Sequence, residues 1–167
     1  MNKNILVLGG AGYVGSSLVP ELLDKGHNVS VYDLFLYGNH LKTHKNLKIF
    51  RGDIRDLIYL SECLKNIDTV IHLACISNDP SFELNPKLSK TINYECFEPF
   101  VDLSIASGVN RFIFASSSSV YGIKKEKNVT EKSILEPLTY YSKYKVKCEE
   151  ILLSKKSQSF NPIILRP

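Results

Sequence analysis

The chain has 167 residues, which is long enough for one domain with a sizeable hydrophobic core. Its formal charge of +4 is mild, and its one lysine-rich run at 124–127 is typical of a solvated loop, so we expect no nucleic-acid partner. No apolar stretch approaches the ~20 residues of a membrane span and no signal-peptide pattern precedes the first apolar run, so we expect a cytoplasmic protein with no membrane anchor.

Short apolar runs alternate with helix-like segments along the whole chain. The apolar runs are typical of parallel strands that are covered on both faces. The predicted strands are Ile5–Leu8, Asn28–Tyr32, Leu47–Phe50, Thr69–Leu73, Arg111–Ala115 and Ile163–Leu165. The predicted helices are Gly12–Lys25, Leu57–Lys65, Leu88–Ala106 and Tyr140–Leu153. This order predicts an α/β fold with a doubly wound parallel sheet of the Rossmann type, as one domain over residues 1–167.

A glycine-rich turn separates the first predicted strand from the first predicted helix. Gly9, Gly12 and Gly15 follow the spacing G-x-x-G-x-x-G, which is a weak motif when it stands alone. Between a strand and a helix, glycines allow a tight turn and a close ligand, and the helix start attracts phosphate. The stretch therefore predicts a pyrophosphate site for a dinucleotide.

Asp33 lies at the end of the second strand, 18 residues after Gly15. A carboxylate at about this distance is typical of one that binds the ribose hydroxyls of adenosine, and its charge repels a 2′-phosphate. We therefore predict NAD rather than NADP, although Arg51 and Arg55 are phosphate-binding residue types close by. The plainer alternative for Asp33 is a solvated turn residue.

Asp53 and Ile54 follow the third predicted strand. A carboxylate and an apolar side chain there are suited to an adenine amino group and ring face. The alternative is that Asp53 or Asp56 caps the second helix. The spacing alone does not decide between the two.

Two later stretches carry side chains suited to acid–base chemistry. Ser116–Ser119 follow the fifth strand, where consecutive hydroxyls either bind a polar ligand or form a serine-rich turn. Tyr141 and Lys145 share one helix face, and an ammonium beside a phenol lowers its pKa from ~10, as a general base requires. The spacing Y-x-x-x-K is also common on helix surfaces. The long segment 117–139 has little pattern, which is typical of a functional loop.

Taken in order, these stretches resemble the extended short-chain dehydrogenase/reductases, and among them the NAD-dependent epimerase/dehydratases that act on nucleotide sugars. The resemblance covers essentially the whole chain and rests on residues 9–15, Asp33, 52–54, 72–74, the Ser-Ser-x-x-Val-Tyr-Gly stretch and Tyr141-x-x-x-Lys145. It implies that Tyr141 is the catalytic base, that Ser117 is the active-site hydroxyl, and that Lys145 holds the nicotinamide ribose. It implies cofactor contacts from Gly9, Gly12, Tyr13, Val14, Gly15, Asp33, Asp53, Ile54, Leu73, Ala74 and Lys145.

Asn93 and the four cysteines are expected to have structural rather than catalytic roles. The resemblance implies that Asn93 is a structural hydrogen-bonding residue and that Cys75 stands where alanine is commoner, as a packing residue. The four cysteines, Cys63, Cys75, Cys96 and Cys148, lie far apart without C-x-x-C spacing. They are typical of free thiols in a reducing compartment, and we expect no metal site.

Ser118 and Ser119 bear on which reaction to expect. The family's dehydratases carry acidic residues there, because eliminating water needs an additional acid and base. Their absence disfavours dehydratase and decarboxylase activity, and favours a nucleotide-sugar C4 epimerase or a ketoreductase.

The length of the chain bears on whether it acts alone. Family members typically continue into a C-terminal substrate-binding domain, so the resemblance implies a truncated enzyme that lacks this domain and is impaired by itself. The alternative is a non-catalytic NAD-binding module. The resemblance also implies a homodimer through the helices near 88–106 and 140–153.

Overall fold

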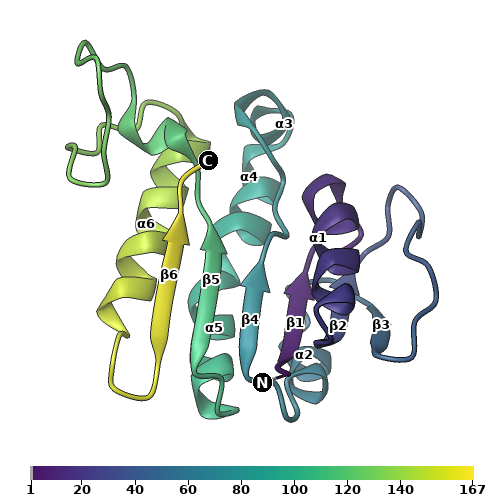
Figure 1. Ribbon diagram of the computed structural model, residues 1–167. Helices are drawn as coiled ribbons and strands as arrows, with labels where there is room; N and C mark the ends of the chain where they lie inside the picture. The colour runs from purple at the N-terminus through teal and green to yellow at the C-terminus, as the bar shows by residue number, and fades with distance from the viewer. Residues whose placement is uncertain (1) are drawn as a thin grey trace.

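The computed structural model describes residues 2–167, which form a single parallel sheet flanked by helices (Figure 1). In chain order the elements are β1 (Asn4–Leu8), α1 (Tyr13–Asp24), β2 (Asn28–Asp33), β3 (Leu47–Arg51), α2 (Leu57–Cys63), β4 (Thr69–His72), α3 (Asp79–Glu83), α4 (Pro86–Lys90), a π-turn (Thr91–Glu95), α5 (Phe97–Ala106), β5 (Arg111–Ala115), a 3₁₀ turn (Ser118–Tyr121), α6 (Tyr140–Ser154) and β6 (Asn161–Leu165). All six predicted strands and all four predicted helical regions are confirmed, with shifts of a few residues at their ends.

The strands pair in the order β3-β2-β1-β4-β5-β6. β1 pairs in parallel with β2 on one side, from Asn4↔Asn28, and with β4 on the other, from Ile5↔Thr69. The strand order therefore reverses between β1 and β4, and ligands bind outside the carboxyl ends of strands at such a switch point. Figure 1 shows that all strand arrows end at the same edge of the sheet, where the C-terminus also lies.

Alternate residues of the central strands face two separate hydrophobic cores. Leu6 and Leu8 of β1 face the larger core, together with side chains of α2, α5 and α6. Ile5 and Val7 face the smaller core, which α1 completes with Val19. Complete burial of one such aliphatic side chain stabilises the fold by roughly 1.5–3 kcal/mol, so the two-sided pattern holds the central strands in register.

The edge strands depart from the prediction that every strand is covered on both faces. In β3 the side chains of Lys48 and Ile49 are exposed, and in β6 Leu165 is 53% exposed. Both strands lie at an edge of the sheet and have a neighbour on one side only. The prediction is therefore correct for the central strands and wrong for the two edges.

The segment predicted as one helix over 88–106 consists of α4, a π-turn and α5. The π-turn Thr91–Glu95 replaces the regular hydrogen-bond pattern for five residues, and such turns are frequent at functional sites. The sequence analysis missed α3, although Asn78-Asp79-Pro80 carries a start signal: Asn78 caps the helix and Pro80 stands in its first turn. Among residues 2–167, no helix is long and apolar enough to cross a membrane.

Candidate active site

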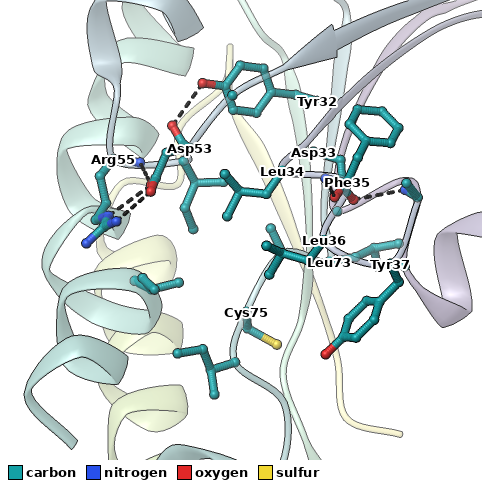
Figure 2. Close-up of a pocket in the computed structure, with 18 of the residues that line it drawn as sticks. Tyr32, Asp33, Leu34, Phe35, Leu36, Tyr37, Asp53, Arg55, Leu73 and Cys75 are labelled. Atoms are coloured by element: carbon teal, nitrogen blue, oxygen red, sulfur yellow. Dashed lines mark hydrogen bonds and ion pairs between the residues drawn. The ribbon is translucent and has the colours of Figure 1, made fainter. Parts of the chain in front are cut away.

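A pocket of about 410 Å³ opens beside the switch point, at the carboxyl ends of the strands. It is lined by the turn after β1, residues 32–37, residues 52–55, residues 73–76, Leu88 and Ile92. Figure 2 shows Asp33 and Asp53 on opposite sides of this pocket. The predicted cofactor residues in its lining are Gly9, Gly12, Asp33, Asp53, Ile54, Leu73 and Ala74. The structure thus gathers these seven positions, which are scattered through the sequence, around one space.

Two glycines of the turn are required by close backbone contacts. Gly9 has φ +75°, and a Cβ at this position would lie 2.7 Å from the Ala74 backbone nitrogen. A Cβ on Gly15 would lie 2.5 Å from the backbone of Gly10. Larger side chains would therefore push apart the turn, the start of α1 and the loop after β4, which together form one wall of the pocket.

The start of α1 offers unpartnered backbone donors. Gly12 is the N-cap residue and makes no side-chain capping bond, and the first turn contains no acidic residue. Tyr13 is 96% exposed and Val14 is 58% exposed, and neither lines the pocket. A bare helix N-terminus of this kind fits a diphosphate, because its N–H groups and dipole both favour negative charge. The predicted contacts of Tyr13 and Val14 with the cofactor stay a prediction.

Asp33 is held in place by the turn that it faces. One carboxylate oxygen accepts a hydrogen bond from the Ala11 N–H at 3.0 Å, and the other accepts one from the Phe35 N–H at 2.8 Å. Each carboxylate oxygen can accept two hydrogen bonds, so each has capacity left for a hydroxyl donor. The carboxylate is therefore anchored and still suited to a ribose diol.

Asp53 is tied to Arg55. One carboxylate oxygen lies 2.9 Å from Nε of Arg55 and the other lies 2.5 Å from its Nη2, and this hydrogen bonding holds the pKa of Asp53 below its usual range. Asp56, not Asp53, caps α2, since its carboxylate accepts from the Tyr59 N–H at 3.0 Å. Of the two residues that the sequence left open as the cap of this helix, Asp56 is the one. Arg55, which also lines the pocket, is neutralised by Asp53.

The loop after β4 is fixed by Asn93 of the π-turn. The side-chain oxygen of Asn93 accepts from the Ile76 N–H at 2.8 Å, and its nitrogen donates to the Ile76 carbonyl at 2.9 Å. The expected structural role of Asn93 is confirmed by this pair of bonds. Cys75, expected only to pack, lines the pocket next to Leu73 and Ala74.

Helix α6 carries Tyr141 and Lys145 on a buried face. Tyr141 is 8% exposed and Lys145 is 5% exposed. Nζ of Lys145 donates to the Ala115 carbonyl at the end of β5 at 2.7 Å, and lies 5.6 Å from the centre of the Tyr141 ring. Thr139 begins the helix with a capping box that it shares with Ser142. Burial excludes the plain surface interpretation of the Y-x-x-x-K spacing, because neither side chain is solvated.

The expected lowering of the Tyr141 pKa is wrong. Burial, together with the neighbouring Cys75 and Asp79, raises the pKa of Tyr141 to about 12. Interactions with the Asn78 backbone and the Ser117 side chain oppose this rise, whereas Lys145 is not among the groups that shift it. The physical reason is that the apolar surroundings disfavour a phenolate.

Ser117 lies at the boundary between β5 and the 3₁₀ turn. It is half-buried and caps that turn, and its hydroxyl oxygen accepts from the Ser119 N–H at 3.2 Å and from the Ser119 hydroxyl at 2.9 Å. Hydrogen bonding by its side chain lowers the pKa of Tyr141. Ser117, Tyr141 and Lys145 lie outside the lining of the pocket. Cys75 links these residues to the pocket, because it is part of the lining and raises the pKa of Tyr141.

The sequence analysis missed a buried charged network beside these residues. Glu149 is 2% exposed; it accepts from the Ser116 hydroxyl and pairs with Arg166, whose Nη2 lies 2.5 Å away. Nη1 of Arg166 also donates to the Tyr121 hydroxyl at 2.9 Å. The spacing of Tyr141, Lys145 and Glu149 at steps of four residues was a usable signal for one helix face. No local pattern indicated Arg166 as the partner.

Comparison with known proteins places these features in a family. The model of the NAD dependent epimerase/dehydratase family matches residues 5–167. The UDP-glucose 4-epimerase of Lactobacillus helveticus is 33% identical over 150 residues, which cover 89% of this chain and 46% of that protein. The chain spans about half the length of the curated relatives it matches.

Solved structures agree with this match. The UDP-N-acetylglucosamine 4-epimerase from Methanobrevibacter ruminantium, in complex with UDP-N-acetylmuramic acid, has a TM-score of 0.90 at 29% identity, over 99% of this chain and 54% of that one. The UDP-glucose 4-epimerase of Thermus thermophilus, in complex with NAD, has a TM-score of 0.88 at 26% identity, over 98% and 54%. The expectation of NAD agrees with the family description and with this complex. Because the family model spans nearly the whole chain and the switch-point pocket fits a dinucleotide, the chain belongs to the NAD-dependent epimerase/dehydratase family.

Proposed function

We propose that this chain carries the cofactor-binding and acid–base part of an NAD-dependent enzyme that inverts the C4 hydroxyl of a nucleotide-linked sugar. The observation that carries the proposal is the grouping of Ser117, Tyr141 and Lys145 beside the pocket that Asp33 flanks. The similarity to UDP-sugar 4-epimerases supports the same reaction class.

The residues around the pocket have distinct tasks in this proposal. The bare start of α1 and the glycine turn bind the diphosphate, and the free acceptor capacity of Asp33 binds the adenosine ribose. Ile54 and Leu73 supply apolar contacts in the same lining. Asp53 would meet an adenine amino group only with the oxygen lone pairs that Arg55 leaves free.

Tyr141 handles the proton of the reaction. Bound NAD would supply the hydride chemistry: an acceptor for the C4 hydrogen and, once reduced, a donor to the opposite face of the sugar. Tyr141 takes the proton of the C4 hydroxyl as the ketone forms and gives it back as the ketone is reduced. Ser117 donates a hydrogen bond to the same oxygen. Lys145 would hold the nicotinamide ribose, and its positive charge, 5.6 Å from the centre of the Tyr141 ring, would favour the phenolate.

The experiment that tests the proposal combines binding and turnover. NAD affinity is measured by calorimetry on residues 1–167, and conversion of UDP-sugars at C4 is followed with NAD present. Tyr141→Phe is expected to lower turnover about 10²–10⁴-fold while leaving NAD affinity nearly unchanged. Tyr140→Phe is the matched control, because this neighbour on the same helix is 57% exposed.

The outcomes separate the candidate functions. Loss of NAD binding in Tyr141→Phe contradicts the assigned role of the phenol. NAD binding with no sugar conversion, even at high protein concentration and over a long incubation, favours the non-catalytic NAD-binding module, because the truncated enzyme is expected to be slow rather than inactive. Stoichiometric oxidation of added NADH, as its hydride reduces a 4-keto sugar and no NADH is regenerated, favours a ketoreductase.

We also propose that residues 1–167 are a single NAD-binding domain and that efficient turnover needs sugar and nucleotide contacts from outside it. The support is that the relatives are about twice as long as the stretch matched. A chain of residues 1–167 that epimerises as fast as a full-length relative would contradict this.

A homodimer through α4, α5 and α6 is proposed as well. α5 and α6 lie side by side on one face of the sheet, as the shared core shows, and Lys155 of the loop after α6 pairs with Asp102 of α5. The expected result in sedimentation velocity is the mass of two chains, and a single-chain mass would contradict it. A reducing, cytoplasmic location is proposed too, supported by four cysteines that are all free.

A further inference from the structure

Ser119 makes two hydrogen bonds to one atom of the residue assigned as the active-site hydroxyl. Its backbone N–H donates to the Ser117 hydroxyl oxygen at 3.2 Å, and its own hydroxyl donates to the same oxygen at 2.9 Å. A serine hydroxyl has one proton to donate and two lone pairs that accept. Both acceptor positions of Ser117 are therefore occupied from one side.

The consequence is a fixed polarity for the Ser117 hydroxyl. With both lone pairs engaged, its proton is directed away from Ser119, so the group acts as a donor. This hydroxyl is also among the groups that lower the pKa of Tyr141. A hydroxyl that only donates is suited to an oxygen that gains negative charge, such as the sugar oxygen or the phenolate.

The 3₁₀ turn that presents Ser119 is held at both ends. The Ser118 N–H donates to the Pro167 carbonyl at 2.8 Å, and the Val120 N–H donates to the Ser117 carbonyl at 3.2 Å. Val120 and Tyr121 are buried, and the Tyr121 hydroxyl accepts from Arg166. Because the backbone of the turn is fixed in this way, the Ser119 side chain has a constant position relative to Ser117.

The adjacent serine has no such role. Ser118 is exposed, and the hydrogen bond that the structure shows for it is made by its backbone. Among the four consecutive serines, Ser116 bonds to Glu149, Ser117 caps the turn, and Ser119 bonds to Ser117. The run is therefore a set of side chains with different partners rather than a solvated serine turn.

We propose that Ser119 is a positioning residue that keeps the Ser117 hydroxyl a hydrogen-bond donor toward Tyr141 and the reacting oxygen. The inference rests on the proposed function for the meaning of that oxygen. Ser119 is thereby added to the three residues with assigned roles, Ser117, Tyr141 and Lys145. The sequence pattern alone does not distinguish it from Ser118.

The test compares three variants of residues 1–167: Ser119→Ala, Ser119→Thr and the matched control Ser118→Ala. The decisive readout does not depend on turnover. Tyrosines are labelled with ¹³C at Cζ, and the Tyr141 signal is assigned by its disappearance in Tyr141→Phe. The signal is followed from pH 7 to pH 10.5, where the onset of phenol ionisation is visible.

The expected result is a changed Tyr141 signal in Ser119→Ala, with ionisation beginning at higher pH, because Ser117 no longer stabilises the phenolate. Ser119→Thr retains the hydroxyl and is expected to match the parent, and so is Ser118→Ala. Identical Tyr141 signals and onsets in all four proteins, each checked for folding by its amide spectrum, would overturn the proposal. So would an equal change in Ser118→Ala and Ser119→Ala.

A kinetic arm distinguishes this proposal from the proposed function. With UDP-sugar and NAD, Ser119→Ala is expected to lower kcat about five- to tenfold and to change KM little. The limb of its kcat–pH profile that reports ionisation of the base is expected to move to higher pH. If the parent protein converts no sugar even at high concentration and over a long incubation, the proposed function fails, while the Tyr141 signal still decides the role of Ser119. If the parent converts sugar and Ser119→Ala shows neither change, only the positioning role fails.

Discussion

The buried carboxylate of Glu149 depends on a few hydrogen-bond partners. Its carboxylate is 2% exposed and is hydrogen-bonded by Arg166 and Ser116, which directly follow β6 and β5 respectively. Hydrogen bonding to Glu149 raises the pKa of Arg166 above its ordinary range, so the guanidinium stays ionised. The pair joins α6, which carries Tyr141 and Lys145, to the end of the sheet.

We predict that Arg166→Met destabilises the protein by about 3–5 kcal/mol, because it leaves a buried carboxylate without its partner. The double variant Glu149→Gln/Arg166→Met is expected to recover part of this loss, because the buried group is then neutral. Urea unfolding of the single and double variants measures both. Strictly additive losses would contradict the coupling.

His72 provides a second prediction at this scale. It is 6% exposed and lies among the rings of Phe97, Phe100, Phe112 and Phe114. Burial, helped by the charge of Lys145, lowers the pKa of His72 from 6.5 to about 3. Between these two values the unfolded chain binds a proton that the folded chain does not.

The free energy of unfolding is therefore expected to fall as the pH drops below 6.5, by about 1.4 kcal/mol per unit from this group. Urea unfolding at pH 6.5 and pH 4.5 measures the loss. His72→Leu lacks the titrating group, so its loss over this window should be smaller by about 2–3 kcal/mol. Equal losses in both proteins would show that His72 is not the cause.

At the scale of elements, the contact between α1 and the glycine turn determines the shape of the cofactor site. A Cβ on Gly15 would lie 2.5 Å from Gly10, so α1 must move if residue 15 is larger than glycine. We predict that Gly15→Ala costs about 1–3 kcal/mol of stability and weakens NAD binding about tenfold, since the helix start leaves the turn.

Gly108→Ala is the control for this prediction. Gly108 has φ +85° and nothing within 4 Å of the added Cβ, so alanine there strains the backbone far from the site. It is expected to cost about 1 kcal/mol and to leave NAD affinity unchanged, as measured by unfolding and calorimetry. If both variants lost NAD affinity equally, the loss would reflect stability rather than the contact at α1.

At the scale of the whole molecule, ligand binding and folding are linked. A ligand at about 100 times its dissociation constant stabilises the folded state by about 2.7 kcal/mol. We predict that NAD raises the unfolding temperature of residues 1–167 and that NADP raises it much less, because the Asp33 carboxylate repels a 2′-phosphate. Thermal unfolding with each dinucleotide at equal concentration measures this. Equal stabilisation by NADP would contradict the role of Asp33.

The fold and the outline of the site were predictable because they depend on short stretches of sequence. The apolar runs predicted all six strands, and the turn from Gly9 to Gly15 was placed correctly between a strand and a helix. Asp33, at the end of β2, was likewise placed correctly beside that turn. Each of these inferences needs only neighbouring residues, whose periodicity and backbone preferences act locally.

Other features needed contacts between distant residues. The pairing of Glu149 with Arg166 and the bonds of Asn93 to Ile76 join separate elements, and no local pattern records them. The Tyr141 pKa could not be predicted from the nearby Lys145, because burial, to which Phe82 of α3 contributes, raises it and Lys145 is not among the groups that shift it. The short helix α3 and the π-turn also depend on packing against α6.

The sequence by itself determined a dinucleotide-binding parallel sheet with a serine, a tyrosine and a lysine in the order that the family uses, because strand, turn and helix signals are local. Only the tertiary structure decided which groups are free to act. It paired Asp53 with Arg55, raised the Tyr141 pKa, and directed the Ser117 hydroxyl through Ser119. The physical reason is that desolvation and hydrogen-bond partners depend on distances in space, which the spacing of residues along the chain does not contain.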